Sequence, residues 1–269
     1  MTHALPYWHV DAFADRPFAG NQAAVMPLEN WLDDAVLLAI AEENLFAETA
    51  FVVRDTTGEA DWELRWFTPT EEVRLCGHAT LASGHVLLAR DGGERVTFRT
   101  RRAGLLAVER SGDAYELALP LIRTERGDWP EAVALLGAQP QEVWLNPDGY
   151  GIYLFADAAT VSALDPDLRG LGALGNDQFI CTAPGTDTDV VSRVFVPGGG
   201  VDEDSFTGSA HAALTHFWAE RLGRESFSAF QASQRGGYAH CRRDGDRAVL
   251  SGPCVTVVEG RFYLPQVSG

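Results

Sequence analysis

The chain has 269 residues, of which 46% are hydrophobic and 22% are charged, a balance typical of a globular protein with one large domain or two of ordinary size. Its 21 basic and 38 acidic residues give a net charge of −17. This excess of acidic residues argues against nucleic acid as a partner, because phosphate binding needs clustered Lys and Arg.

The sequence also argues against secretion and membrane insertion. The first residues have neither the basic nor the apolar region of a signal peptide, and no apolar run is long enough to span a bilayer. Four scattered cysteines fit neither a zinc site nor a disulfide framework: Cys76, Cys181, Cys241 and Cys254. We therefore expect a reduced, cytoplasmic protein.

The first half of the chain predicts short strands around two helices. Residues 31–43 carry apolar side chains with the period of an amphipathic helix, whereas residues 79–88 are apolar on nearly every side, as in a fully buried helix. Strands are expected at 7–13, 23–26, 45–53, 61–68, 95–100, 105–110 and 114–119. A buried helix among strands indicates a curled sheet wrapped around it.

The second half follows a crossover at residues 120–129 and predicts a comparable mixture. Helices are expected at 130–136, 157–164 and 208–222, the last ending at Gly223 in the left-handed conformation. Strands are expected at 142–145, 151–155, 178–183, 190–196, 227–232, 238–242, 247–251, 255–259 and 262–264. Residues 197–200, Pro-Gly-Gly-Gly, predict a flexible loop where a lid could hinge.

One pattern occurs twice in the same order. Each copy reads Arg-x-Phe-x-Pro, then an acidic loop, then Gly-x-Ala and an apolar helix: residues 65–69 lead to Cys76-Gly77-His78-Ala79, and residues 193–197 lead to Thr207-Gly208-Ser209-Ala210. Two ordered copies indicate an internal duplication and two similar domains. Backbone N–H groups at the start of such a helix can bind a carboxylate or a phosphate.

Three polar residues near these helix starts are candidates for chemistry. Glu48 begins a strand beside an apolar run, and burial shifts a carboxyl group toward the pKa that general acid/base catalysis needs, although it could be a solvated strand-end residue. His78 lies in a first helical turn, where the dipole lowers the pKa of an imidazole and favours its neutral form, unless it is a packed capping residue. Asp204 could contact substrate or simply cap the helix.

Several common catalytic motifs are absent from the sequence. It contains no H-E-x-x-H pattern, no G-x-S-x-G, no G-x-G-x-x-G and no G-x-x-x-x-G-K-[ST]. We therefore expect no metal site, no hydrolase nucleophile and no dinucleotide or ATP.

Taken together, five segments resemble the PhzF family of phenazine-biosynthesis isomerases and their relatives. They are Phe18-Ala19-Gly20-Asn21, Glu48-Thr49-Ala50-Phe51-Val52, Phe67-Thr68-Pro69, Cys76-Gly77-His78-Ala79-Thr80 and Glu203-Asp204-x-x-Thr207-Gly208-Ser209-Ala210. The resemblance runs in order from the N-terminus to about Leu222. Departures at Gln22 and at Ser205-Phe206 place the chain in the broad PhzF-like branch rather than with the phenazine enzyme itself.

The resemblance implies an α+β fold of the diaminopimelate epimerase type: two pseudo-symmetric domains, each a β-barrel wrapped around a central α-helix, with the active site between them. We expect the domains at 1–120 and 121–260, with a C-terminal strand at 261–269 as a further element of the first. The resemblance also implies a homodimer.

The resemblance further implies a cofactor-independent isomerase that acts on a small carboxylate-bearing substrate. It assigns the catalytic roles to Glu48 as proton carrier, with His78 and Asp204. The implied substrate-binding residues are Gly77, Gly208, Ser209, Thr207, Asn21 and Cys76.

Two other functions stay open at this point. Epimerases of this fold use two thiols, but Cys76 is matched in the second copy by Thr207, whose hydroxyl is too weak an acid to replace a thiolate. This mismatch disfavours a two-thiol epimerase but leaves one that uses Glu48 with Cys76. A non-catalytic protein that binds a small metabolite is the other alternative.

Overall fold

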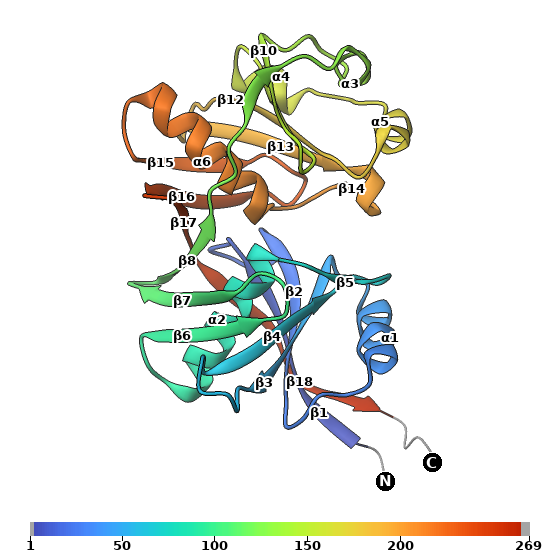
Figure 1. Cartoon of the computed structure of the whole chain (residues 1–269), viewed down its shortest axis with the longest axis vertical. Helices are drawn as coiled ribbons and strands as arrows, with labels where there is room; N and C mark the ends of the chain where they lie inside the picture. Colours follow the sequence, from blue (N-terminus) through green and yellow to red (C-terminus); the bar gives the residue numbers. More distant parts are fainter. Residues whose placement is uncertain (1–2, 265–269) are drawn as a thin grey trace. The chain divides into compact units, whose positions relative to one another are not determined.

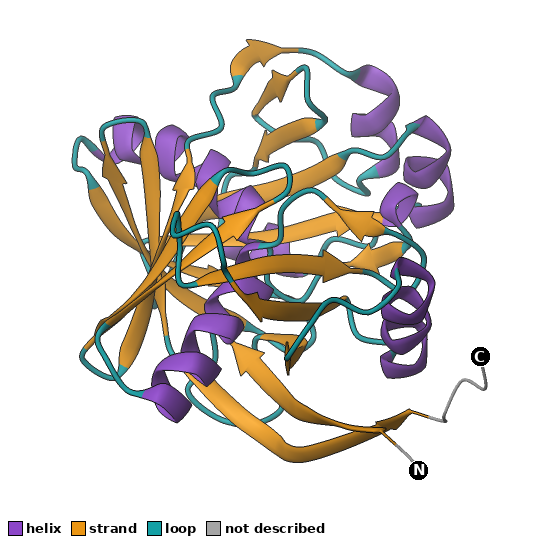
Figure 2. Ribbon diagram, turned by 60° about the horizontal axis from the view of Figure 1, so that its bottom comes forward, coloured by secondary structure: helices purple, strands orange, loops and turns teal. Residues whose placement is uncertain are grey.

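The structure, a computed structural model, describes residues 3–264, in which strands outnumber helices (Figure 2). The chain divides into two compact units. Unit 1 comprises the residues up to Ala118 and those from Gly252 onward, and unit 2 comprises Leu119–Ser251. The expected second domain extended to residue 260, but residues from 252 onward belong to unit 1, because the last strand pairs with the first. Residues 265–269 of the expected C-terminal strand lie outside the described residues.

Unit 1 is a mixed sheet with two helices (Figure 1). The elements are β1 (His3–Ala12), β2 (Asn21–Leu28), α1 (Asp34–Asn44), β3 (Glu48–Arg54), β4 (Trp62–Phe67), β5 (Glu72–Val73), α2 (Gly77–Asp91), β6 (Arg95–Thr100), β7 (Leu105–Ser111), β8 (Ala114–Pro120) and β18 (Cys254–Leu264). Strand β1 is antiparallel to both β18 and β2, β2 is parallel to β3, and β3 is antiparallel to β4. Strand β4 is parallel to β6, β6 is antiparallel to β7, and β7 is antiparallel to β8. The short β5 lies beside β4.

Helix α2 is the centre of unit 1. Nearly all of its side chains are buried, and it contacts β1, β2, β3, β6, β7 and β18. This is the environment that its all-round apolar sequence predicts. Helix α1 is amphipathic and covers part of the opposite face of the sheet, where Leu37, Ile40 and Ala41 pack against residues such as Met26 and Phe51.

Unit 2 repeats the same order of pairings. Its elements are β9 (Glu125–Gly127), α3 (Pro130–Leu135), β10 (Glu142–Asn146), β11 (Tyr150–Leu154), α4 (Ala158–Ser162), α5 (Leu168–Leu174), β12 (Gln178–Pro184), β13 (Val190–Val196), η1 (Pro197–Gly199), β14 (Val201–Glu203), α6 (Gly208–Leu222), β15 (Ser226–Gln231), β16 (Gly237–Asp244) and β17 (Arg247–Gly252). Strand β11 is parallel to β12, β12 is antiparallel to β13, β13 is parallel to β15, and β15, β16 and β17 are antiparallel. The buried helix α6 therefore corresponds to α2, and the expected α+β fold of two similar units is confirmed.

The duplicated Arg-x-Phe pattern builds the same brace in each unit. In unit 1, Nε and Nη2 of Arg65 donate to the two carboxylate oxygens of Glu72, both at 2.8 Å. The same guanidinium lies 4.9 Å from the centroid of the Phe67 ring. The brace ties β4 to the short strand that leads into α2.

The brace in unit 2 has matching geometry. Nε and Nη2 of Arg193 donate to the two oxygens of Glu203 at 2.7 and 2.9 Å, and the guanidinium lies 4.8 Å from the centroid of the Phe195 ring. Glu203 is therefore a structural partner of Arg193. Planar guanidinium–carboxylate pairs of this kind fix geometry as well as charge, so the internal duplication is visible at the level of side chains.

Some expected elements differ from the observed ones. Residues 197–199 form a short 3₁₀ turn rather than an unstructured loop, and the expected strands at 255–259 and 262–264 are one strand, β18. Helix α5 and the short strands β5, β9 and β14 were not expected, because segments this short carry little periodicity.

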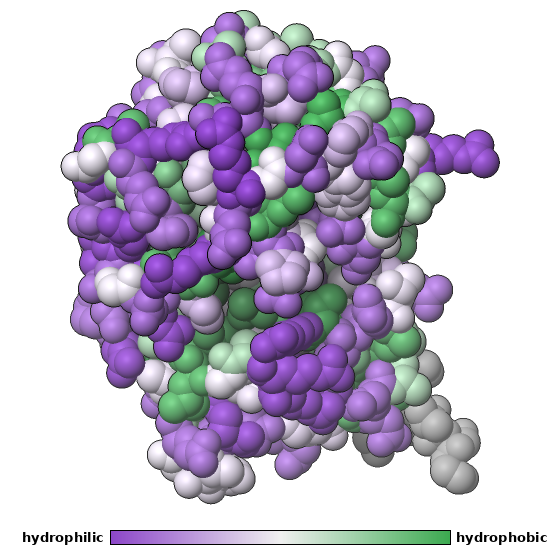
Figure 3. All heavy atoms as spheres, turned by 45° about the horizontal axis from the view of Figure 1, so that its top comes forward, coloured by the Kyte–Doolittle hydropathy of each residue, from purple (hydrophilic) through white to green (hydrophobic). Residues whose placement is uncertain are grey.

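Hydrophilic side chains cover most of the face shown in Figure 3. Among the described residues, the helices all fall short of the length and apolarity needed to cross a bilayer.

Candidate active site

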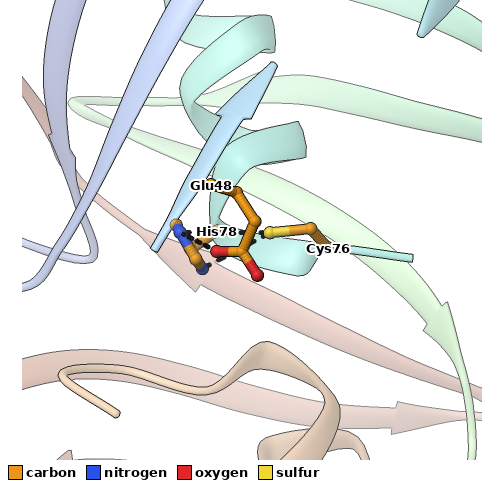
Figure 4. Close-up of side chains that lie close together, drawn as sticks. All are labelled: Glu48, Cys76 and His78. Atoms are coloured by element: carbon orange, nitrogen blue, oxygen red, sulfur yellow. Dashed lines mark hydrogen bonds and ion pairs between the residues drawn. The ribbon is translucent and has the colours of Figure 1, made fainter. Parts of the chain in front are cut away.

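Three expected site residues of unit 1 meet at the start of α2 (Figure 4). Strand β3 supplies Glu48 from its first position, Cys76 is the N-cap residue just before α2, and His78 lies in the first turn of α2. Nε2 of His78 lies 3.1 Å from Oε2 of Glu48, and Sγ of Cys76 lies 3.5 Å from Nδ1 of His78. Cys76 and His78 are buried, whereas the Glu48 side chain keeps 18% of its surface exposed.

Asn21 joins this cluster from the first residue of β2. Its side-chain nitrogen lies 3.2 Å from Nδ1 of His78. When His78 is neutral with its proton on Nε2, it accepts from Asn21 at Nδ1 and donates toward Glu48 at Nε2. An imidazolium instead donates from both nitrogens and requires the Asn21 amide to present its oxygen. The cluster can thus hold either protonation state of His78.

The carboxylate oxygen that faces His78 is buried and, among the described residues, receives no well-aligned hydrogen bond. A positive charge on His78 therefore stabilises the Glu48 carboxylate mainly by electrostatic attraction rather than through an aligned hydrogen bond. Buried polar atoms without an aligned partner are uncommon and tend to mark functional sites.

The charge state of His78 differs from the sequence expectation. Burial disfavours the imidazolium, but the neighbouring Cys76 sulfur and the Glu48 carboxylate outweigh it, and the pKa of His78 is raised well above its usual range. We assign this rise to Glu48, because burial and the Glu48 charge raise the pKa of the Cys76 thiol to about 11 and leave it uncharged at neutral pH. The helix dipole, which was expected to keep His78 neutral, is the weaker influence.

This raised pKa predicts how the stability of the protein depends on pH. A group whose pKa is higher in the folded than in the unfolded chain stabilises the fold fully below its unfolded pKa of about 6.5, and this contribution is lost as the pH rises through the folded pKa. His78→Gln should therefore cost more unfolding free energy near pH 6 than at alkaline pH. Urea denaturation of both proteins across this range checks it, and a pH-independent difference would contradict it.

Glu48, Cys76 and His78 also offer one donor atom each, all within 4.8 Å of one another, a spacing at which such groups could hold a metal ion. The same spacing suits direct proton transfer between the carboxylate and the imidazole. Treatment of the protein with a chelator distinguishes metal binding from proton transfer at this cluster.

The expected site residues of unit 2 gather at the start of α6. The hydroxyl of Thr207 donates to Oδ2 of Asp204 at 2.6 Å, and Gly208 is the first residue of the helix. Ser209 lies in the first turn, where its Oγ accepts from the side-chain amide of Gln178 at 3.0 Å. Asp204 therefore serves as a partner of the residue before the helix rather than as its N-cap.

Sequence reasoning missed Gln231, the fully buried last residue of β15. Its Oε1 accepts from the Thr207 backbone N–H at 2.9 Å, and its Nε2 donates to the Asp204 carbonyl at 2.7 Å. One side chain thus fixes both ends of the turn before α6. No motif marks Gln231, since its partners become neighbours only when β15 pairs with β13.

Beneath the same turn lies another buried histidine. Nδ1 of His211 donates to the Thr207 carbonyl at 2.8 Å, and its ring stacks on Phe206 with centroids 4.2 Å apart. Burial lowers the pKa of His211 to about 4, so it is neutral. His211 and Phe206 are therefore packed structural residues of this turn.

The chain is similar to known proteins over nearly its whole length. The sequence model of the family described as "Phenazine biosynthesis-like protein" matches residues 10–260. A Pseudomonas aeruginosa protein described as an uncharacterized isomerase is 44% identical over 97% of this chain and 99% of its own length. The crystal structure of a PhzF-family phenazine biosynthesis protein from Enterococcus faecalis has a TM-score of 0.91 at 40% identity and covers 97% of this chain and 100% of that one.

A more distant structure supports the fold alone. A hydroxyproline epimerase from Agrobacterium vitis has a TM-score of 0.63 at 13% identity, covering 98% of this chain and 94% of that one. The fold and the relatives together define an isomerase. The chain belongs to the PhzF family of phenazine biosynthesis-like proteins.

Proposed function

We propose that the chain is a cofactor-independent isomerase that moves a proton between two carbons of a small unsaturated carboxylate, with Glu48 as the acid/base. The observation that carries this proposal is the Glu48 carboxylate itself. It is partly exposed, it lies 3.1 Å from Nε2 of the buried His78, and its inner oxygen receives no aligned hydrogen bond among the described residues. A carboxylate in this setting can take up a proton and release it again.

The reaction needs no oxidant, reductant or cofactor. A carboxylate oxygen of Glu48 removes a proton from one substrate carbon, and the C–H electron pair moves along the conjugated system of the substrate. The protonated Glu48 then returns the proton to the distant carbon, which forms a new C–H bond. His78 stabilises the carboxylate before and after transfer, and Asn21 fixes the orientation of the His78 ring.

The same proposal gives binding roles to the remaining residues. The backbone amides at Gly77 and Gly208 are suited to a substrate carboxylate, because helix starts present unpaired N–H groups. Ser209 adds a hydroxyl donor, and Asp204 and Thr207 supply polar contacts. Cys76 contributes to the wall of the pocket as an uncharged thiol. Homodimer formation and a cytoplasmic location belong to this proposal too.

Deuterium incorporation in D₂O tests the function directly. A panel of small cyclic and unsaturated amino or hydroxy carboxylates, including dihydro-hydroxyanthranilate, is incubated with the protein and followed by NMR. We expect label at carbon in at least one compound, and that exchange should persist after the protein is treated with a chelator. Exchange that disappears on chelation and returns with a metal ion would replace acid/base chemistry by a metal site at the Glu48 cluster.

An epimerase that uses Glu48 together with Cys76 is the second candidate, favoured by the 3.5 Å contact between Cys76 and His78. Because the Cys76 thiol has a pKa of about 11, it is a poor base at neutral pH. We therefore predict that Cys76→Ala lowers the exchange rate by less than about tenfold, whereas loss of a catalytic acid/base costs about a hundredfold or more. A Cys76→Ala protein without measurable exchange would favour the epimerase.

Binding of panel compounds without any exchange would instead favour the alternative of a non-catalytic protein that binds a small metabolite. The isomerase names of the relatives disfavour this alternative.

A further inference from the structure

The duplication identifies a counterpart of Glu48 in unit 2. In unit 1, Thr49 pairs with Phe67 of the Arg-x-Phe pattern, and in unit 2 Phe179 pairs with Phe195 of the second pattern. The residue before Thr49 is Glu48, the first residue of β3, and the residue before Phe179 is Gln178, the first residue of β12. From these residues onward, β3 runs parallel to β2 and β12 runs parallel to β11.

The partner of each residue is duplicated as well. His78 and Ser209 each follow the first glycine of their helix. Glu48 lies 3.1 Å from His78, and the Gln178 side-chain nitrogen lies 3.0 Å from the Ser209 oxygen. The two units thus place a strand-start residue against the second residue of the buried helix in the same way.

The chemistry of the two pairs is different. The pair in unit 1 can exchange a proton, because a carboxylate faces an imidazole. The pair in unit 2 cannot, because neither an amide nor a serine hydroxyl gains or loses a proton near neutral pH. Gln178 donates its N–H to Ser209 Oγ at 3.0 Å, and the serine hydroxyl can either donate back to Gln178 Oε1 at 3.3 Å or turn to donate to a ligand.

We propose that Gln178 is a positioning residue that holds the Ser209 hydroxyl as a hydrogen-bond donor toward the substrate carboxylate and keeps the position that corresponds to Glu48 uncharged. This inference rests on the proposed function, which supplies the carboxylate substrate. It restricts proton transfer to the copy that carries Glu48, and it explains why a glutamine rather than a second glutamate stands at the duplicated position.

Reciprocal substitutions test the inference through binding rather than turnover. The probes are benzoate and benzamide, which share size and planarity but differ in charge, with dissociation constants measured by calorimetry or ligand-observed NMR. Gln178→Glu should weaken benzoate binding by about tenfold, because a carboxylate beside Ser209 repels the probe at close range, and should leave benzamide binding within about twofold. Glu48→Gln, the opposite exchange in unit 1, should not weaken benzoate binding.

A double-mutant cycle shows whether Gln178 acts through Ser209. Gln178→Leu should weaken benzoate binding several-fold in the unaltered chain but have no further effect in a Ser209→Ala background. Circular dichroism and a thermal melt identify any variant that is unfolded. If a variant of one experiment is unfolded, the other experiment, the reciprocal substitutions or the double-mutant cycle, decides. Equal losses for both probes, an additive double mutant, or no saturable benzoate binding to the unaltered chain would overturn the inference. The proposed function fails on a different result, namely carbon exchange that is absent or that survives Glu48→Gln.

Discussion

Glu48→Gln is expected to lower the rate of proton exchange at the substrate carbon by about a thousandfold, within the range seen when a general acid/base is removed. Glutamine keeps the size and hydrogen-bonding reach of the side chain but cannot accept the proton. The measurement is NMR-detected deuterium incorporation into the panel compound that the unaltered protein labels.

The matched control for this variant is Glu71→Gln, the same chemical change at an exposed residue of unit 1. It should leave exchange within about twofold, because an exposed carboxylate interacts weakly with distant groups. An exchange rate in Glu48→Gln equal to that of this control would show that another residue carries the proton. A melt of each variant separates lost chemistry from lost fold.

Gln231→Leu is expected to destabilise the protein by about 3 kcal/mol, because it removes the hydrogen bonds that Gln231 makes to one buried and one partly buried backbone group, and each such loss costs about 1–3 kcal/mol. The two groups are the N–H of Thr207 and the carbonyl of Asp204, which Gln231 joins at 2.9 and 2.7 Å. Because the same two groups flank the start of α6, the variant should also bind benzoate more weakly. Urea denaturation gives the change in unfolding free energy.

Gln234→Leu makes the same substitution at an exposed position nearby and should change the unfolding free energy by no more than about 0.5 kcal/mol. If both leucine variants were equally stable, the hydrogen bonds of Gln231 would not be what holds the turn. A loss of stability without any loss of benzoate affinity would show that the turn tolerates displacement.

Much of the fold could be predicted from patterns that are local in the sequence. The apolar periodicity and Gly223 gave α6 its observed bounds, and the paired Arg-x-Phe segments indicated the duplication that the structure confirms. These signals are readable because helix starts, helix ends and strand cores depend on neighbouring residues.

The features that could not be predicted depend on residues that meet only in the folded chain. The pKa of His78 is set by Glu48, which arrives from another strand, and so the helix dipole alone gave the wrong direction. Gln231 has no motif of its own, and the Arg-x-Phe pattern that contains Arg193 does not reveal that Glu203 is its partner. Glu48 and Gln178 could not be aligned by spacing, because the hairpins that follow them have loops of different length.

The pairing of β1 with β18 has a consequence for synthesis on the ribosome. His3, at the start of β1, pairs with Leu264, so β1 must wait for β18, the last of the described strands, before its sheet is complete. Unit 2 is contiguous in sequence and can finish folding earlier, whereas the cluster of Glu48, Cys76 and His78 belongs to the unit that closes only after β18 has been made. Until then one edge of β1 stays open, and open edges of this kind invite pairing with other chains. The nascent protein is therefore most prone to aggregate just before unit 1 is finished.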